Sequence, residues 1–141
     1  MRIKIAALTG LGLASLITGS ALAHHAFTAQ YDSEKPVALT GVVVKIEWLN
    51  PHAYFFIDVA DEASGEVATW EAEMGSPVVL MRQGWTRDSM KIGDEVSVEG
   101  IRARNGSLSL NAQSVVLTST GQRLFTRSRE EERSVAAEPT R

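Results

Sequence analysis

Short runs rich in β-branched and aromatic residues, separated by turn-forming residues, constrain the fold of this chain more than any other feature. Turn signals such as Asn50-Pro51 and Asn105-Gly106 stand between neighbouring runs. The pattern predicts five strands, over Val37–Trp48, His52–Val59, Glu66–Met74, Glu95–Ala103 and Ser107–Leu117. Gly41, inside the first of these, suggests a bulge or a sharp bend. The sequence therefore predicts an all-β protein.

One short helix is expected between the third and fourth strands. Ser76 is a good N-cap, Pro77 suits the first helical position, and Gly84 suits the residue just past the end. The resulting order, three strands, a helix and two strands, is typical of a small five-stranded OB-like barrel. An open β-sandwich or meander is the alternative. In an OB-like barrel, the ligand face would lie within 52–74.

The first residues read as a secretory signal peptide. Arg2 and Lys4 precede an apolar run over 5–17, and Ala21-Leu22-Ala23 forms a cleavage site. The run is shorter than the roughly 20 residues of a membrane-spanning helix, so no stable span is expected after cleavage. We expect cleavage after Ala23 and export to the periplasm. The remaining parts would be an extended segment (24–36), a small β-barrel domain (37–125) and a disordered charged tail (126–141).

Composition excludes several classes of protein. The chain has 141 residues, enough for one core, and its formal net charge of −3 argues against a nucleic-acid partner. It has no cysteine, which excludes disulfides, thiolate catalysis and zinc fingers. A bound metal ion would therefore need histidine, carboxylate or methionine ligands.

Several short motifs of the sequence resemble those of a family of small exported bacterial proteins known only as a domain of unknown function, DUF6152. The resemblance covers roughly residues 24–125 and implies a secreted, single-domain β protein. It brings no established activity, so no catalytic residue follows from it. The motifs are His24-His25-Ala26-Phe27, Glu47-Trp48-Leu49-Asn50-Pro51-His52, Met74-Gly75-Ser76-Pro77, Arg82-Gln83-Gly84-Trp85-Thr86-Arg87-Asp88-Ser89 and Gly93-Asp94-Glu95-Val96.

The three histidines are the candidate metal ligands. Cleavage after Ala23 would leave His24 at the N-terminus, where its α-amine and imidazole could chelate one ion. A further imidazole from His25 or His52 would complete an arrangement resembling the histidine brace of copper oxygenases. Imidazole favours Cu(II), Zn(II) and Ni(II), and Cu(II) binds most tightly among these. The alternative is that these histidines are solvated, or that His52 stabilises a turn.

Aromatic residues form a second candidate site. Trp48, Tyr54, Phe56 and Trp70 fall on or beside the second and third predicted strands. On one exposed face such rings would bind a glycan or a protein partner. The alternative is that they build the core, because a small domain needs large apolar side chains.

Glu71 and Glu73 share one strand face by their spacing, and a solvated face accounts for them better than an acid–base pair. No catalytic motif of a known kind is present. We therefore expect a non-enzymatic binding or accessory module of the periplasm. Its ligand would be a transition-metal ion, copper, held by the N-terminal histidines. The alternative is a protein-interaction or glycan-binding module that uses the aromatic residues, with a periplasmic protein or small molecule as partner.

Overall fold

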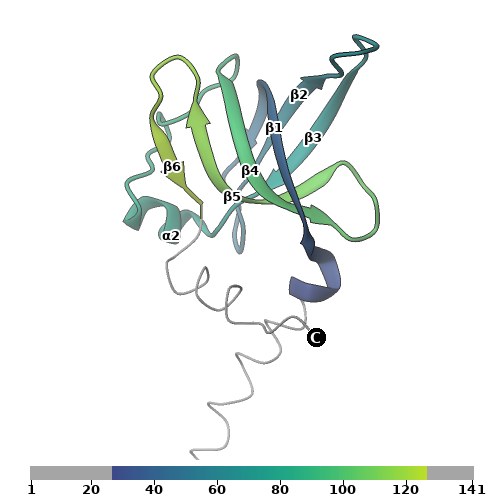
Figure 1. Cartoon of the computed structure of the whole chain (residues 1–141). Helices are drawn as coiled ribbons and strands as arrows, with labels where there is room; N and C mark the ends of the chain where they lie inside the picture. Colours follow the sequence, from purple (N-terminus) through teal and green to yellow (C-terminus); the bar gives the residue numbers. More distant parts are fainter. Residues whose placement is uncertain (1–26, 127–141) are drawn as a thin grey trace, which may run out of the picture.

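A computed structural model describes residues 27–126 of the chain. Residues 27–30 are helical and lead into the first strand (Figure 1). The short helix α2 (Pro77–Arg82) follows the third strand, with Ser76 as its N-cap and Pro77 in its first turn, as predicted. The strands are β1 (Tyr31–Glu47), β2 (Tyr54–Ala60), β3 (Val67–Glu73), β4 (Glu95–Ala103), β5 (Ser109–Leu117) and β6 (Arg123–Phe125).

The strands belong to one sheet that returns on itself. Neighbours follow the order β3-β2-β1-β4-β5-β6, and β3 also pairs with β5. That last pairing is parallel and joins residues 71–73 to 109–111, whereas the others are antiparallel. Hydrogen bonds therefore run in a ring through five strands. The predicted all-β class with one short helix between the third and fourth strands is confirmed, and β6 is an additional strand at the edge of β5.

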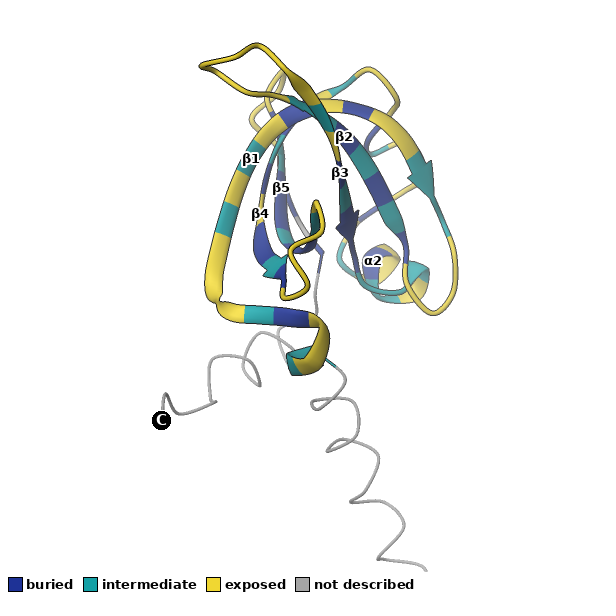
Figure 2. Ribbon diagram, turned by 90° about the vertical axis from the view of Figure 1, so that its right-hand side faces the viewer, coloured by how far each residue is buried: buried dark blue, intermediate teal, exposed yellow. Residues whose placement is uncertain are grey.

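The core fills the inside of this ring. Alternate residues of a strand point to opposite faces, and on β2 Phe55 and Ile57 are fully buried while Tyr54 and Phe56 are half-buried. Figure 2 shows this alternation as bands along the strands. Leu80 of α2 joins the same apolar cluster. Burial of this continuous apolar surface is the main stabilisation of the fold.

The first strand is longer than expected. The extended segment predicted over 24–36 is helical at 27–30 and belongs to β1 from Tyr31 onward. β4 supplies the partners, since Tyr31 pairs with Ala103 and Pro36 with Ile101. Residues 24–26 and the predicted signal peptide, 1–23, lie outside the described residues.

At Gly41, where a bulge or sharp bend was predicted, the pairing of β1 with β4 continues without a change of register. An added Cβ at Gly41 would lie 2.5 Å from the carbonyl oxygen of Asp58, so glycine allows the close approach of β2. The change in register lies further along, between Val43 and Lys45.

The folded part extends past the predicted start of the charged tail. Thr126 is fully buried, its amide donates to the carbonyl of Gln113, and its carbonyl accepts from Gly75. Thr126 therefore belongs to the domain, and residues 127–141 lie outside the described ones. Within residues 27–126, no helix combines the length and apolar character that crossing a membrane requires.

Candidate functional site

Two rows of side chains cross the outer face of the sheet where β3 meets β5. Tyr54 is the partner of Glu73, and Glu73 is the partner of Asn111. The neighbouring row contains Phe56, Glu71 and Ser109. The residues between the rows, such as Ala72, are buried inside the ring. The closing pairing of the ring thus places polar side chains from three strands next to one another.

Glu73 is the centre of this polar cluster. Its carboxylate is almost fully buried, and a buried charge is costly unless it is hydrogen-bonded. Three groups meet that need. The hydroxyl of Tyr31 donates to Oε2 over 2.9 Å, Nδ1 of His52 lies 3.1 Å from Oε1, and Nδ2 of Asn111 donates to Oε1 over 3.3 Å. The carboxylate is therefore held in one orientation.

The start of the described chain covers the cluster. Tyr31 is buried and packs with Phe27, Ile101 and Ala103 in an apolar cluster separate from the main core. The ring centroids of Phe27 and Tyr31 lie 5.4 Å apart. Burial and the charge of Glu73 raise the pKa of Tyr31 well above its ordinary range. The phenol therefore stays protonated and donates to the carboxylate at neutral pH.

Tyr54 borders the cluster from β2. Burial raises its pKa, and the charges of Glu73 and Glu71 act in the same direction. Glu71 itself is half-buried and accepts a hydrogen bond from the Ser109 hydroxyl over 3.2 Å. The expected solvated face of paired glutamates is thus not what the structure shows, because Glu73 is covered and Glu71 has a side-chain partner.

His52 is the exposed member of the cluster. It follows the cis peptide Asn50-Pro51 and precedes β2. Its side chain is 45% exposed although Nδ1 faces the buried carboxylate of Glu73. An imidazole anchored through Nδ1 presents Nε2 to a ligand, which is the arrangement that a carboxylate gives to metal-binding histidines.

The other two predicted metal ligands, His24 and His25, lie outside the described residues. Among residues 27–126, no group of three or more histidine, aspartate or glutamate side chains is arranged to hold a metal ion. His52 is therefore the predicted metal ligand that the structure describes, and Glu73 is a partner that the prediction did not include.

The predicted aromatic site is divided among different environments. Trp70 pairs with Ile57 and belongs to the buried core, so it does not share the outer face with Tyr54 and Phe56. The guanidinium of Arg102 lies over its ring, 5.1 Å from the centroid. Trp70 acts as core, the alternative raised by the size of the domain.

Phe56 and Trp48 have different neighbours. Phe56 is half-buried, with the Lys45 ammonium 4.8 Å from its ring centroid. Trp48 packs edge-on against Trp85, with centroids 6.5 Å apart. The four rings therefore do not form one continuous platform.

Sequence reasoning did not find Tyr31 or Asn111. Tyr31 stood in a polar stretch without strand signals, and Asn111 stood inside an otherwise ordinary strand. The spacing of Glu71 and Glu73 correctly predicted that both side chains lie on one face of a strand. Only the tertiary contact with Tyr31 shows that Glu73 is buried.

The fold and the cluster define a small β domain whose strands pair in a ring and in which the buried carboxylate of Glu73 contacts the exposed imidazole of His52. The model of the family of unknown function DUF6152 matches residues 12–111, and the chain belongs to this family. No curated protein matches the chain significantly.

Proposed function

We propose that this protein is an exported, non-enzymatic module of the periplasm that binds a transition-metal ion, with copper as the best candidate. The ligands are His52 and the N-terminal histidines His24 and His25. Export rests on the signal-peptide pattern and its cleavage site after Ala23.

The pairing of His52 with Glu73 carries this proposal. A metal-binding histidine almost always donates its second ring N–H to a carboxylate, a carbonyl or water, which orients the ring and raises its basicity. Here Nδ1 of an exposed imidazole lies 3.1 Å from a carboxylate that is itself buried. Imidazole nitrogen is a preferred ligand of copper.

The described chain begins beside this pair. Phe27 packs on Tyr31, and Tyr31 donates to the same carboxylate that contacts His52. His25 precedes Phe27 by two residues, which span at most about 7 Å of extended chain. The sequence order thus favours N-terminal ligands for an ion at His52.

The contacts of Glu73 support a binding role for His52. Its oxygens accept from Tyr31, His52 and Asn111 together, so the carboxylate acts as an orienting group for the imidazole. The non-enzymatic character of the proposal rests on the sequence, in which no catalytic motif of a known kind is present.

Calorimetric titration of the secreted protein tests the proposal. The full-length precursor is expressed in a bacterial host, purified from the periplasm and checked at its N-terminus by mass spectrometry. Titrations with Cu(II) and Zn(II) then compare it with two variants, one with an additional alanine before His24 and one carrying His52→Ala. We expect stoichiometric, sub-micromolar copper binding that the extension abolishes and His52→Ala weakens. Weak binding that neither change affects would contradict the proposal.

The alternative, a protein-interaction or glycan-binding surface, now rests on Tyr54 and Phe56. If copper binding fails, Ala variants of these two residues are the next comparison, because both lie on the outer face of β2.

A further inference from the structure

Asn105 and Gly106 are exposed in the turn between β4 and β5. An asparagine side chain is chemically labile, because the backbone nitrogen of the next residue can attack its amide carbon. Glycine hinders this attack least, since it has no Cβ. The space that a Cβ of Gly106 would occupy is open, with no atom within 4 Å. The turn is therefore accessible to the water that such a reaction consumes.

The hydrogen bonds of the turn favour this attack. The Ser107 amide donates to Oδ1 of Asn105 over 3.0 Å. The ring of atoms that this hydrogen bond closes includes the Gly106 nitrogen, so the bond keeps the Asn105 amide carbon near that nitrogen. The same donor would stabilise the negative charge that develops on Oδ1 during attack. The Gly106 amide itself donates to the Ala103 carbonyl over 3.4 Å, a long and therefore weak hydrogen bond.

The other two asparagines of the chain lack this combination. Asn50 precedes Pro51, whose backbone nitrogen carries no hydrogen. Asn111 and the residue after it, Ala112, are both buried in β5. These asparagines therefore serve as controls within the same molecule.

We propose that Asn105-Gly106 is a self-modification site, at which the chain converts asparagine to aspartate and isoaspartate. The Gly106 nitrogen forms a bond to Cγ of Asn105, and the side-chain nitrogen leaves as ammonia with the proton that Gly106 loses. Water then opens the resulting succinimide. Cleavage of the bond to Cγ gives aspartate, and cleavage at the backbone carbonyl gives isoaspartate, whose main chain runs through Cβ and Cγ. The inference does not rest on the proposed function.

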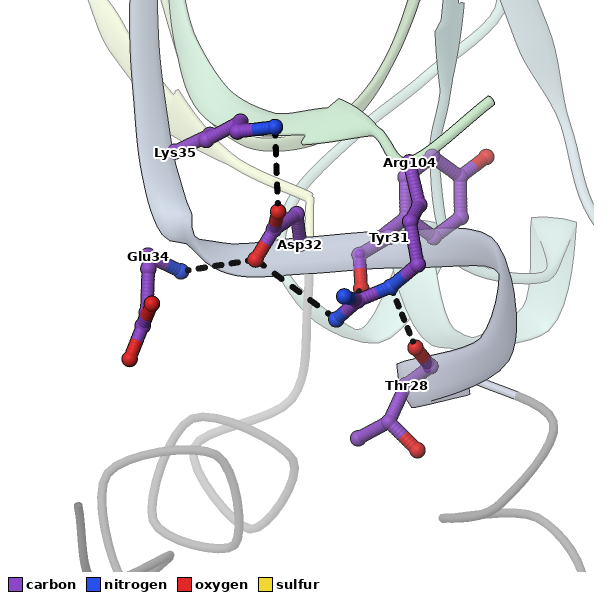
Figure 3. Close-up of polar contacts among 6 residues, drawn as sticks. All are labelled: Thr28, Tyr31, Asp32, Glu34, Lys35 and Arg104. Carbon is purple, nitrogen blue, oxygen red and sulfur yellow. Dashed lines mark hydrogen bonds and ion pairs between the residues drawn. The ribbon is translucent and has the colours of Figure 1, made fainter. Parts of the chain in front are cut away.

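Isoaspartate here is expected to weaken the contact between Arg104 and the segment 27–32. The Arg104 amide donates to the Gln30 carbonyl over 2.9 Å, and its Nε donates to the Thr28 carbonyl over 3.1 Å. Figure 3 shows its guanidinium beside Asp32 as well, with Nη2 3.5 Å from Oδ1. Because loop length fixes the register of a hairpin, a longer main chain directly after Arg104 should displace it from these partners.

Incubation of the purified full-length protein at mildly alkaline pH tests the site. In water labelled with heavy oxygen, we expect Asn105 to exchange its side-chain nitrogen for a labelled oxygen and to give both aspartate and isoaspartate. Peptide mass spectrometry with fragmentation locates the change, and a sample digested without incubation is the baseline. Asn105→Ser keeps an oxygen acceptor for the Ser107 amide but has no amide to lose, so it should gain no mass. Asn111 should also stay unmodified.

Two further measurements decide between outcomes. Denatured protein is incubated in parallel, and modification there but not in the folded protein would overturn the inference, because the turn would then protect Asn105. Aspartate without isoaspartate would overturn the succinimide route, since direct hydrolysis of the amide gives aspartate alone. Hydrogen exchange of the Arg104 amide should be faster in the isoaspartate form. Equal exchange in both forms would overturn the effect on segment 27–32 while leaving the modification site.

Discussion

Nδ1 of the exposed His52 lies 3.1 Å from the buried carboxylate of Glu73. The two residues come from the loop before β2 and from the end of β3. The cross-strand pairing of Tyr54 with Glu73 brings these positions together. The exposed imidazole thereby gains a defined orientation from a buried carboxylate.

Replacement of this carboxylate tests its role. Glu73→Gln keeps the size of the side chain but removes the charge that orients the imidazole, so we expect copper affinity to fall by about 10–100-fold. Calorimetric titration measures the change, and Glu99→Gln, at an exposed carboxylate, is the control. Unchanged affinity in Glu73→Gln would show that Glu73 does not support the site.

The Tyr31 hydroxyl is expected to make the free energy of unfolding fall at alkaline pH. The pKa of Tyr31 is raised in the folded state above its ordinary value of 10.0, so the folded state keeps a proton that the unfolded state loses. Stability is therefore fully present below about pH 10 and falls as the pH rises further. Tyr31→Phe removes this contribution and leaves Tyr54 as the remaining tyrosine of the chain.

Thermal unfolding across this pH range compares the two proteins. At neutral pH, Tyr31→Phe leaves Glu73 short of one donor, and we expect a loss of about 1–3 kcal/mol. Above about pH 10 the difference in the free energy of unfolding between the two proteins narrows, because only the unmodified protein loses the contribution of Tyr31. Parallel curves at all pH values would contradict the assignment of this proton to Tyr31.

Aromatic substitutions on the two faces of the sheet should lower the free energy of unfolding by different amounts. Trp70 is buried in the core, so Trp70→Ala should lower the free energy of unfolding by about 3–5 kcal/mol. Phe56 is half-buried on the outer face, and Phe56→Ala should cost less. Denaturant unfolding measures both. Equal losses would mean that the two rings share one environment.

The hydrogen bond of the Thr126 side chain is expected to stabilise the end of the domain. Its buried hydroxyl donates to the carbonyl of Ala112, and Thr126→Val would leave that carbonyl without this donor. We expect a loss of about 1–3 kcal/mol in denaturant unfolding. Thr118→Val is the control, because the Thr118 hydroxyl also donates to a carbonyl but is exposed to water. A loss as small as that of the control would contradict the prediction.

Strands and helices could be predicted from the sequence where their own residues favour that structure. Glu95–Ala103 was predicted with the bounds of β4, and Ser76 and Pro77 marked the start of α2. On β2, the alternation expected of any strand accounts for the burial of Phe55 next to the half-buried Tyr54.

Elements that depend on distant partners could not be predicted in this way. The first part of β1 contains Asp32 and Pro36, which disfavour strands. It is extended because β4 provides a partner backbone. The burial of Glu73 likewise comes from Tyr31, far away in the sequence. In the candidate site, His52 was identified from its residue type, whereas its orienting partner emerged only from the fold.

The parallel pairing between β3 and β5 involves residues 71–73 and 109–111, the shortest contact in the ring of five strands. Glu73 and Asn111 form its last pair, and their side chains are hydrogen-bonded to each other. Glu73 therefore contacts both His52 and the residue that ends this pairing. One carboxylate thus joins an exposed imidazole to the shortest pairing in the ring, so loss of Glu73 is expected to disturb both.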